Sequence, residues 1–156
     1  MTRANTGGFT LLELVVVLVI AALLFALGGP SVRSLYDTMQ YREAVRELVS
    51  AAKNGRRDAF VRGEPVDLLI NTDNNRYALT VNATGIAEDQ FAELPASLNI
   101  TVVYAAEVSP RPGLAAIRFY PAGGSSGGEI SVARPSGAGV HLTIDWLLGD
   151  VVQESL

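Results

Sequence analysis

The apolar stretch that follows Phe9 is the feature that most constrains this chain. From Leu14 to Leu27 every residue is apolar, and from Phe9 to Gly29 only Thr10, Glu13 and glycine interrupt the run. These 21 residues give roughly 31 Å of helix at about 1.5 Å per residue, enough to cross a hydrocarbon core of about 30 Å. A surface helix of a soluble domain keeps a polar face, which this segment lacks. The run therefore predicts a transmembrane helix over residues 9–29.

A cleaved secretory signal is the alternative interpretation of the same segment. Arg3 would then supply the positive end, and cleavage would follow the small residues Ala26 and Gly28. The apolar run is longer than that of a usual signal peptide, and an acid at its start is unusual there. We favour the membrane helix, and a soluble product that begins after Gly28 stays the alternative.

Glu13 is a carboxylate inside the predicted span. Such a group costs roughly 2.5–3.5 kcal/mol at the centre of a membrane helix, and ionisable residues within a span are functional hypotheses by default. The other interpretation is that Glu13 lies near the interface and reaches the headgroups. A buried charge that loses its penalty only on meeting a partner would fix the register of an assembly.

The segment Gly8-Phe9-Thr10-Leu11-Leu12-Glu13 and the apolar run after it resemble the class III signal of type IV pilins and of type II secretion pseudopilins. This resemblance implies a leader over residues 1–8, which prepilin peptidase removes between Gly8 and Phe9 before Phe9 is N-methylated. It also implies that Glu13 is the assembly residue, which pairs with the amino group of Phe9 in a neighbouring subunit. The protein would cross the bacterial inner membrane once, with its C-terminal head in the periplasm.

The helical pattern continues over residues 30–62. Pro30 predicts a kink rather than an end, whereas Gly63 and Pro65 predict the helix terminus. Spacings of mostly three and four predict one apolar stripe that packs on the head, with charges of both signs on the other face. The stripe consists of Val32, Leu35, Met39, Val45, Leu48, Val49, Ala52, Ala59 and Phe60.

Residues 63–156 predict a β-rich globular head. The predicted fold class is therefore α+β, a long N-terminal helix packed on an antiparallel sheet, and the resemblance described above implies a pilin-like fold. Two strands flank the Asn- and Asp-rich turn 71–76, and a loop covers 83–96. The turn could suggest calcium, but no glutamate closes an EF-like loop, so a plain turn is favoured. The two flanking strands cover 66–70 and 77–81. The other predicted strands cover 98–103, 115–120, 129–133 and 140–147, with 151–152 extending the last hairpin.

Three further segments, residues 52–66, 117–130 and 142–151, resemble the H-type minor pseudopilins (GspH) and their FimT-like pilus relatives. The resemblance implies a structural subunit near the tip of the pseudopilus, needed to export folded proteins across the outer membrane. Its implied partners are the major and other minor pseudopilins, prepilin peptidase and the inner-membrane assembly platform, with secreted cargo as a further candidate. The alternative is a minor pilin of a type IV pilus, in pilus assembly or DNA uptake.

The charge of the head argues against nucleic acid as a partner. From Gly63 onward four bases and eleven acids give a net charge of −7, which opposes binding to phosphates. The bases Lys53, Arg56, Arg57 and Arg62 cluster at the helix exit, where we expect the acidic head and helix neighbours to occupy them.

The residues offer no pattern for catalysis or for a cofactor. The chain has no cysteine and one histidine, so we predict no metal site and no cofactor. His141 and Asp145 are four residues apart, roughly 13 Å along a strand, and no nucleophile motif accompanies them. The glycine- and serine-rich stretch 123–128 lacks the lysine of a phosphate-binding loop and leads into a strand. The sequence therefore predicts no enzyme.

Overall fold

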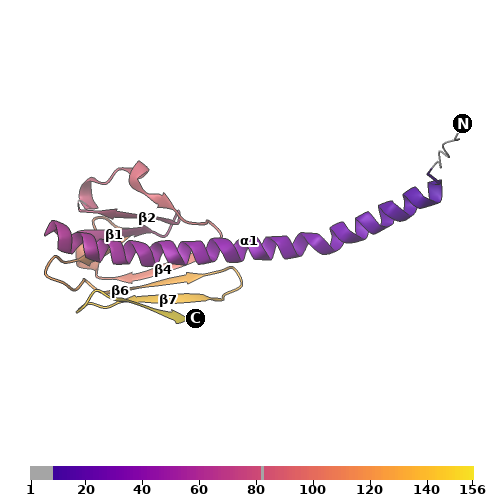
Figure 1. Cartoon of the computed structure of the whole chain (residues 1–156). Helices are drawn as coiled ribbons and strands as arrows, with labels where there is room; N and C mark the ends of the chain where they lie inside the picture. The colour runs from indigo at the N-terminus through magenta and orange to yellow at the C-terminus, as the bar shows by residue number, and fades with distance from the viewer. Residues whose placement is uncertain (1–8, 82) are drawn as a thin grey trace, which may run out of the picture. The chain divides into compact units, whose positions relative to one another are not determined.

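A computed structural model describes residues 9–81 and 83–156, and the side chains of residues 25–34 lie outside this description. One long helix, α1 (Leu11–Arg62), comes first (Figure 1). The chain divides after Thr38 into two compact units, of which the second, from Met39 to Leu156, is the head. The predicted helix of residues 9–62 is confirmed to within two residues at its start.

Gly63 ends α1 as the sequence predicts. Its φ is +71°, a left-handed conformation that glycine adopts without the steric cost that a side chain brings. Its amide donates a hydrogen bond to the carbonyl of Ala59 at 3.0 Å, which satisfies one of the last carbonyls of the helix.

The head contains two four-stranded antiparallel sheets among the described residues, with strand orders β3-β2-β1-β5 and β4-β6-β7-β8. The first sheet uses β1 (Val66–Asn71), β2 (Arg76–Thr80), β3 (Ala92–Glu93) and β5 (Leu114–Phe119). The second uses β4 (Asn99–Tyr104), β6 (Gly128–Ala133), β7 (Gly139–Ile144) and β8 (Val151–Ser155). The predicted α+β class is confirmed.

The part of α1 that belongs to the head lies between the two sheets (Figure 1). Its small and aliphatic residues share one core with residues of both sheets, including Leu68 and Ile117 of the first and Ile130 and Leu142 of the second. This arrangement buries a helix on two sides, which explains why alanine and glycine are frequent on the buried face. The helix residues in this core are Ala44, Val45, Leu48, Ala51, Ala52 and Ala59.

The predicted apolar stripe is only partly correct. Leu35, Met39 and Phe60 expose 65%, 70% and 72% of their surface, although the spacing placed them with the core residues. At 3.6 residues per turn each residue advances by about 100°, so Met39 lies roughly 180° and Phe60 roughly 120° around the helix from the buried Leu48. The side chains of Met39 and Phe60 therefore point away from the sheets.

Two loop predictions also need correction. The segment 83–96 is not a plain surface loop, because Phe91 packs on the outer face of the first sheet against Leu69 and Leu114. The strand predicted to reach residue 147 ends at Ile144. Asp145 Oδ1 accepts the amides of Leu147 and Leu148 at 2.9 and 2.6 Å and thereby turns the chain.

Candidate functional site

The helix start carries the residues to which the sequence assigned assembly. Thr10 lies just before α1, and its Oγ1 accepts the backbone amide of Glu13 at 3.2 Å, while its carbonyl accepts the amide of Leu14 at 3.2 Å. A threonine followed three residues later by glutamate is the spacing of a capping box. Sequence analysis missed this role of Thr10, although the spacing was visible in the sequence.

Glu13 lies in the first turn of α1, where the helix dipole favours a negative charge. Its side chain and that of Phe9, which is 83% exposed, both point away from other parts of the chain. Among the described residues Glu13 forms no ion pair with a base. Gly8, the other residue of the predicted cleavage site, lies outside the described residues, so the processing roles of Gly8 and Phe9 stay predictions.

The first turns of α1 expose apolar side chains all around the helix. Every leucine, valine and isoleucine from Leu11 to Leu24 exposes between 47% and 82% of its surface. Within the part of the chain that the structure describes, no helix combines the length and the apolar character needed to cross a membrane. The predicted span over residues 9–29 and the kink at Pro30, whose side chain lies outside the described residues, stay predictions.

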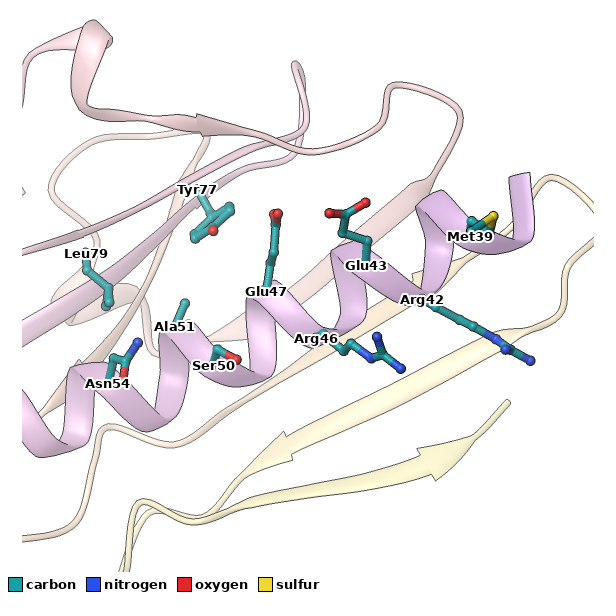
Figure 2. A pocket seen from close by; sticks show the side chains of 10 residues that line it. All are labelled: Met39, Arg42, Glu43, Arg46, Glu47, Ser50, Ala51, Asn54, Tyr77 and Leu79. Carbon is teal, nitrogen blue, oxygen red and sulfur yellow. The ribbon is translucent and has the colours of Figure 1, made fainter. Parts of the chain in front are cut away.

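A groove of about 700 Å³ runs along α1 inside the head, beside β2 (Figure 2). We call it the α1 groove. Figure 2 shows two rows of charge on the helix: Glu43 and Glu47 point toward the side of Tyr77, and Arg42 and Arg46 point to the other side. The groove is lined by Met39, Arg42, Glu43, Arg46, Glu47, Ser50, Ala51, Asn54, Tyr77 and Leu79.

The charges of the groove act on its tyrosine. Burial raises the pKa of the Tyr77 hydroxyl above 10.0, and the charge of Glu47 and its hydrogen bond with the Tyr77 hydroxyl raise that pKa further. The uncharged phenol therefore persists beside the acidic row. The acids and the bases of the groove thus form separate rows, with like charges four residues apart within each row. Like charges at this spacing repel within one helix, so each row gains from a partner of opposite charge.

Tyr41 connects α1 to the second sheet. The guanidinium carbon of Arg134, just after β6, lies 5.2 Å from the centre of the Tyr41 ring, within the range of a cation–π contact. Burial raises the pKa of the Tyr41 hydroxyl, and the charge of Arg134 partly offsets this rise. The contact links the β6–β7 hairpin to α1.

His141 does not contact Asp145, as the spacing predicts, but contacts residues of the neighbouring strand. Its Nδ1 lies 2.8 Å from Ser131 Oγ and its Nε2 lies 3.3 Å from Glu129 Oε2, whereas Asp145 forms the turn after β7. Ser131 is in direct register with His141 on the neighbouring strand, so only the strand pairing could have revealed this contact. Ser131 lies within the ladder of β6, not on the sharp strand-to-helix turn that exposes a nucleophilic serine. Ser131, His141 and Glu129 form a polar cluster that spans β6 and β7.

Two asparagine side chains of the turn that had suggested calcium form hydrogen bonds with the backbone of the head. Asn75 has a φ of +49° and donates from Nδ2 to the carbonyls of Pro95 and Leu98 at 3.1 and 2.8 Å. Asn71 Oδ1 accepts the amide of Asp73 at 3.0 Å. Among the described residues no group of three or more acidic, histidine or cysteine side chains is placed to hold a metal ion.

Comparisons with known proteins match this chain at its N-terminal segment and over nearly its whole length. The model of the prokaryotic N-terminal methylation motif matches residues 3–28. Type II secretion system protein H of Xanthomonas campestris pv. campestris is 26% identical over 151 residues, which cover 97% of this chain and 85% of that protein. The predicted resemblance to H-type pseudopilins is therefore confirmed along nearly the whole sequence.

Two solved structures share the fold. The minor pseudopilin EpsH of the Vibrio cholerae type 2 secretion system matches with a TM-score of 0.54 and 12% identity, over 75% of this chain and 96% of that one. The type IV minor pilin FimU of Pseudomonas aeruginosa matches with a TM-score of 0.58 and 14% identity, over 77% and 92%. The fold is pilin-like, and the fold alone fits both kinds of filament.

Proposed function

We propose that this chain is an H-type minor pseudopilin, a structural subunit of the pseudopilus of a type II secretion system. The observation that carries this proposal is the similarity to a type II secretion system protein H over 97% of the chain, together with the methylation motif at residues 3–28. The subunit acts without catalysis: it is processed, anchored and then incorporated into a filament that serves export of folded proteins across the outer membrane.

In this proposal prepilin peptidase cleaves between Gly8 and Phe9 and methylates Phe9. Residues 9–29 anchor the subunit in the bacterial inner membrane, and the head lies in the periplasm. The apolar side chains exposed around the first turns of α1 support this anchor, because such a surface is stable only against lipid or other apolar helices.

Glu13 directs assembly through its charge. Its carboxylate has no base to pair with among the described residues, and the amino group of Phe9 in a neighbouring subunit would supply one. Such a pair removes the cost of an isolated charge in lipid only when two subunits are in register. The α1 groove, with its separate acidic and basic rows, supports a second contact, in which α1 packs beside the helix of a neighbour in the filament.

A matched set of variants tests the role of Glu13. Glu13→Gln keeps the length of the side chain and the backbone contact with Thr10 but removes the charge. We expect normal cleavage and membrane insertion, and loss of the subunit from sheared filaments. Thr10→Val, which removes the capping hydroxyl and keeps the carboxylate, should still be incorporated. Normal incorporation of Glu13→Gln would refute the pairing.

A minor pilin of a type IV pilus is the second candidate, supported by the TM-score of 0.58 to FimU. Deletion of the gene separates the two: loss of exported proteins from the medium with intact surface pili supports the pseudopilus, and the reverse supports the pilus. The net charge of −7 beyond residue 62 disfavours a direct role in DNA binding.

A further inference from the structure

The last turns of α1 present three side chains that the core does not use. Lys53, Arg57 and Phe60 lie roughly 120–180° around the helix from the buried Leu48, and all three are exposed. Together with Tyr120 they line a cavity of about 460 Å³. The packing of the head does not explain an exposed phenylalanine beside two cations.

Two loops extend this cavity into a larger surface. The loop after β5 contains Gly124, where a Cβ would come within 2.7 Å of the carbonyl oxygen of Trp146. Its φ of +77° and this close contact both require glycine. The loop after β7 therefore lies directly against it and exposes Trp146, Leu147 and Leu148 by 68%, 62% and 55%.

An ion pair fixes these loops to the helix. Arg56 of α1 pairs with Asp150, 94 residues away in the sequence, and Gly149 approaches the Arg56 side chain, since a Cβ there would be 3.5 Å from its Cδ. Because its charge is paired with Asp150, Arg56 holds the loop in place, and the neighbouring cations Lys53 and Arg57 are the ones that can bind a partner. We call the helix-end surface the set Lys53, Arg57, Phe60, Tyr120 and residues 146–148.

The cations of the helix-end surface are available to a partner. Within the described residues Lys53 has no ion pair, and Arg57 reaches only the adjacent Asp58, at 3.4 Å and with 69% of its side chain exposed. The prediction that the acidic head and helix neighbours would occupy the basic cluster is thus correct for Arg56 and Arg57. It is wrong for Lys53 and Arg62, which form no ion pair among the described residues. Lys53 and the exposed Arg57 form a local positive site on a head that is otherwise acidic.

We propose that the helix-end surface binds an acidic segment, with at least one apolar side chain, from the head of another filament subunit. Lys53 and Arg57 would pair with the carboxylates, and Phe60 and Tyr120 would cover the apolar side chain. Phenylalanine, tyrosine and arginine are all enriched at protein interfaces, and tyrosine and arginine often contribute much of the binding energy. Nucleic acid fits less well, because two cations release few counterions and the surrounding head repels phosphates. This inference rests on the proposed function.

Site-specific photo-crosslinking in cells that carry the complete secretion system tests the proposal. The full chain would carry p-benzoylphenylalanine in place of Phe60 or, as a control, in place of Leu156, which is 61% exposed. The amide of Leu156 donates a hydrogen bond to the carbonyl of Gly139 at the start of β7, so this control lies at the end of the second sheet away from residues 146–148. We expect the probe at residue 60, and not the probe at residue 156, to join an acid-rich segment of another filament subunit, as mapped by mass spectrometry of sheared filaments. Crosslinks to nucleic acid, lipid, cargo or a segment without acids would overturn it, as would no crosslink in filaments that contain the chain.

Charge reversal provides a second readout. Lys53→Glu combined with Arg57→Glu should lower the crosslink yield at residue 60 by about tenfold or more, since like charges then face each other. Arg76→Glu combined with Arg111→Glu makes the same change in net charge at exposed ion pairs elsewhere and should leave the yield unchanged. Equal yields in both double variants would overturn the inference. Absence of the unmodified chain from the filaments would instead refute the proposed function.

Discussion

Gly55 lies in the last turns of α1, and its replacement by alanine tests whether helix propensity or packing governs this position. Propensity alone predicts a gain of about 0.8–1.0 kcal/mol. A Cβ at Gly55, however, would lie 2.9 Å from Cδ2 and 3.0 Å from Cε2 of Phe119, and 3.0 Å from Cδ2 of Leu79. Phe119 is fully buried and cannot turn aside without disturbing the core. Overpacking costs about 1–3 kcal/mol, and since the ring is confined we expect a net loss of about 1–2 kcal/mol.

Urea unfolding of the full chain in mild detergent, followed by circular dichroism, measures this difference. Asn54→Ala is the matched control, since Asn54 is the exposed neighbour on the same helix and should gain the propensity without a clash. In a Phe119→Leu background the cost of Gly55→Ala should shrink, because the smaller side chain leaves room for the methyl group. If Gly55→Ala stabilises the protein as much as Asn54→Ala does, the packing argument is wrong.

Two further predictions concern charged groups of the head. Asp67 is buried and accepts hydrogen bonds from Arg118 Nε at 2.6 Å and Nη2 at 2.8 Å. Asp67→Ala should therefore lower the free energy of unfolding by about 2–4 kcal/mol. The loss stays below that of a fully buried pair because the Arg118 side chain is one-third exposed and can be hydrated in the variant. Burial and Glu47 raise the pKa of Tyr77 in the folded protein above 10.0, its value in the unfolded chain. As the pH rises above 10.0, the phenol of the unfolded chain loses its proton first, and the free energy of unfolding should therefore fall. Glu47→Gln should bring the phenolate absorbance titration of Tyr77 closer to 10.0, and Glu43→Gln should leave it unchanged; equal shifts in both variants would contradict the assignment.

The helix and most strands could be predicted from the sequence because their signals are local. The end of α1 depends on Gly63, a single residue with a positive φ. Its start was predicted from the apolar run, whereas the hydrogen bond that Thr10 accepts from Glu13 was missed. Alternation of apolar residues predicted β1, β2 and β4 to β7 within a few residues. The end of β7 was wrong, because the side chain of Asp145 turns the chain where the apolar residues 146–148 continue the strand pattern.

The candidate site could be predicted only in its N-terminal part. Phe9 and Glu13 belong to a motif of consecutive residues, so their proposed roles follow from the sequence alone. The α1 groove and the helix-end surface depend on which side of α1 faces the sheets. The spacing of three and four residues did not define that side precisely. It predicted Met39 and Phe60 to be core residues, whereas both are exposed in the structure.

The sequence by itself determined the processing motif, the long helix and the α+β class, because each depends on residues a few positions apart. The tertiary structure decided what lies far apart in the chain: Phe119 beneath Gly55, Ser131 beside His141, and Asp150 on Arg56. These pairs form only when two sheets close around one helix in a fixed register. Because a register shift of one residue exchanges the faces of a strand, no local pattern specifies such contacts.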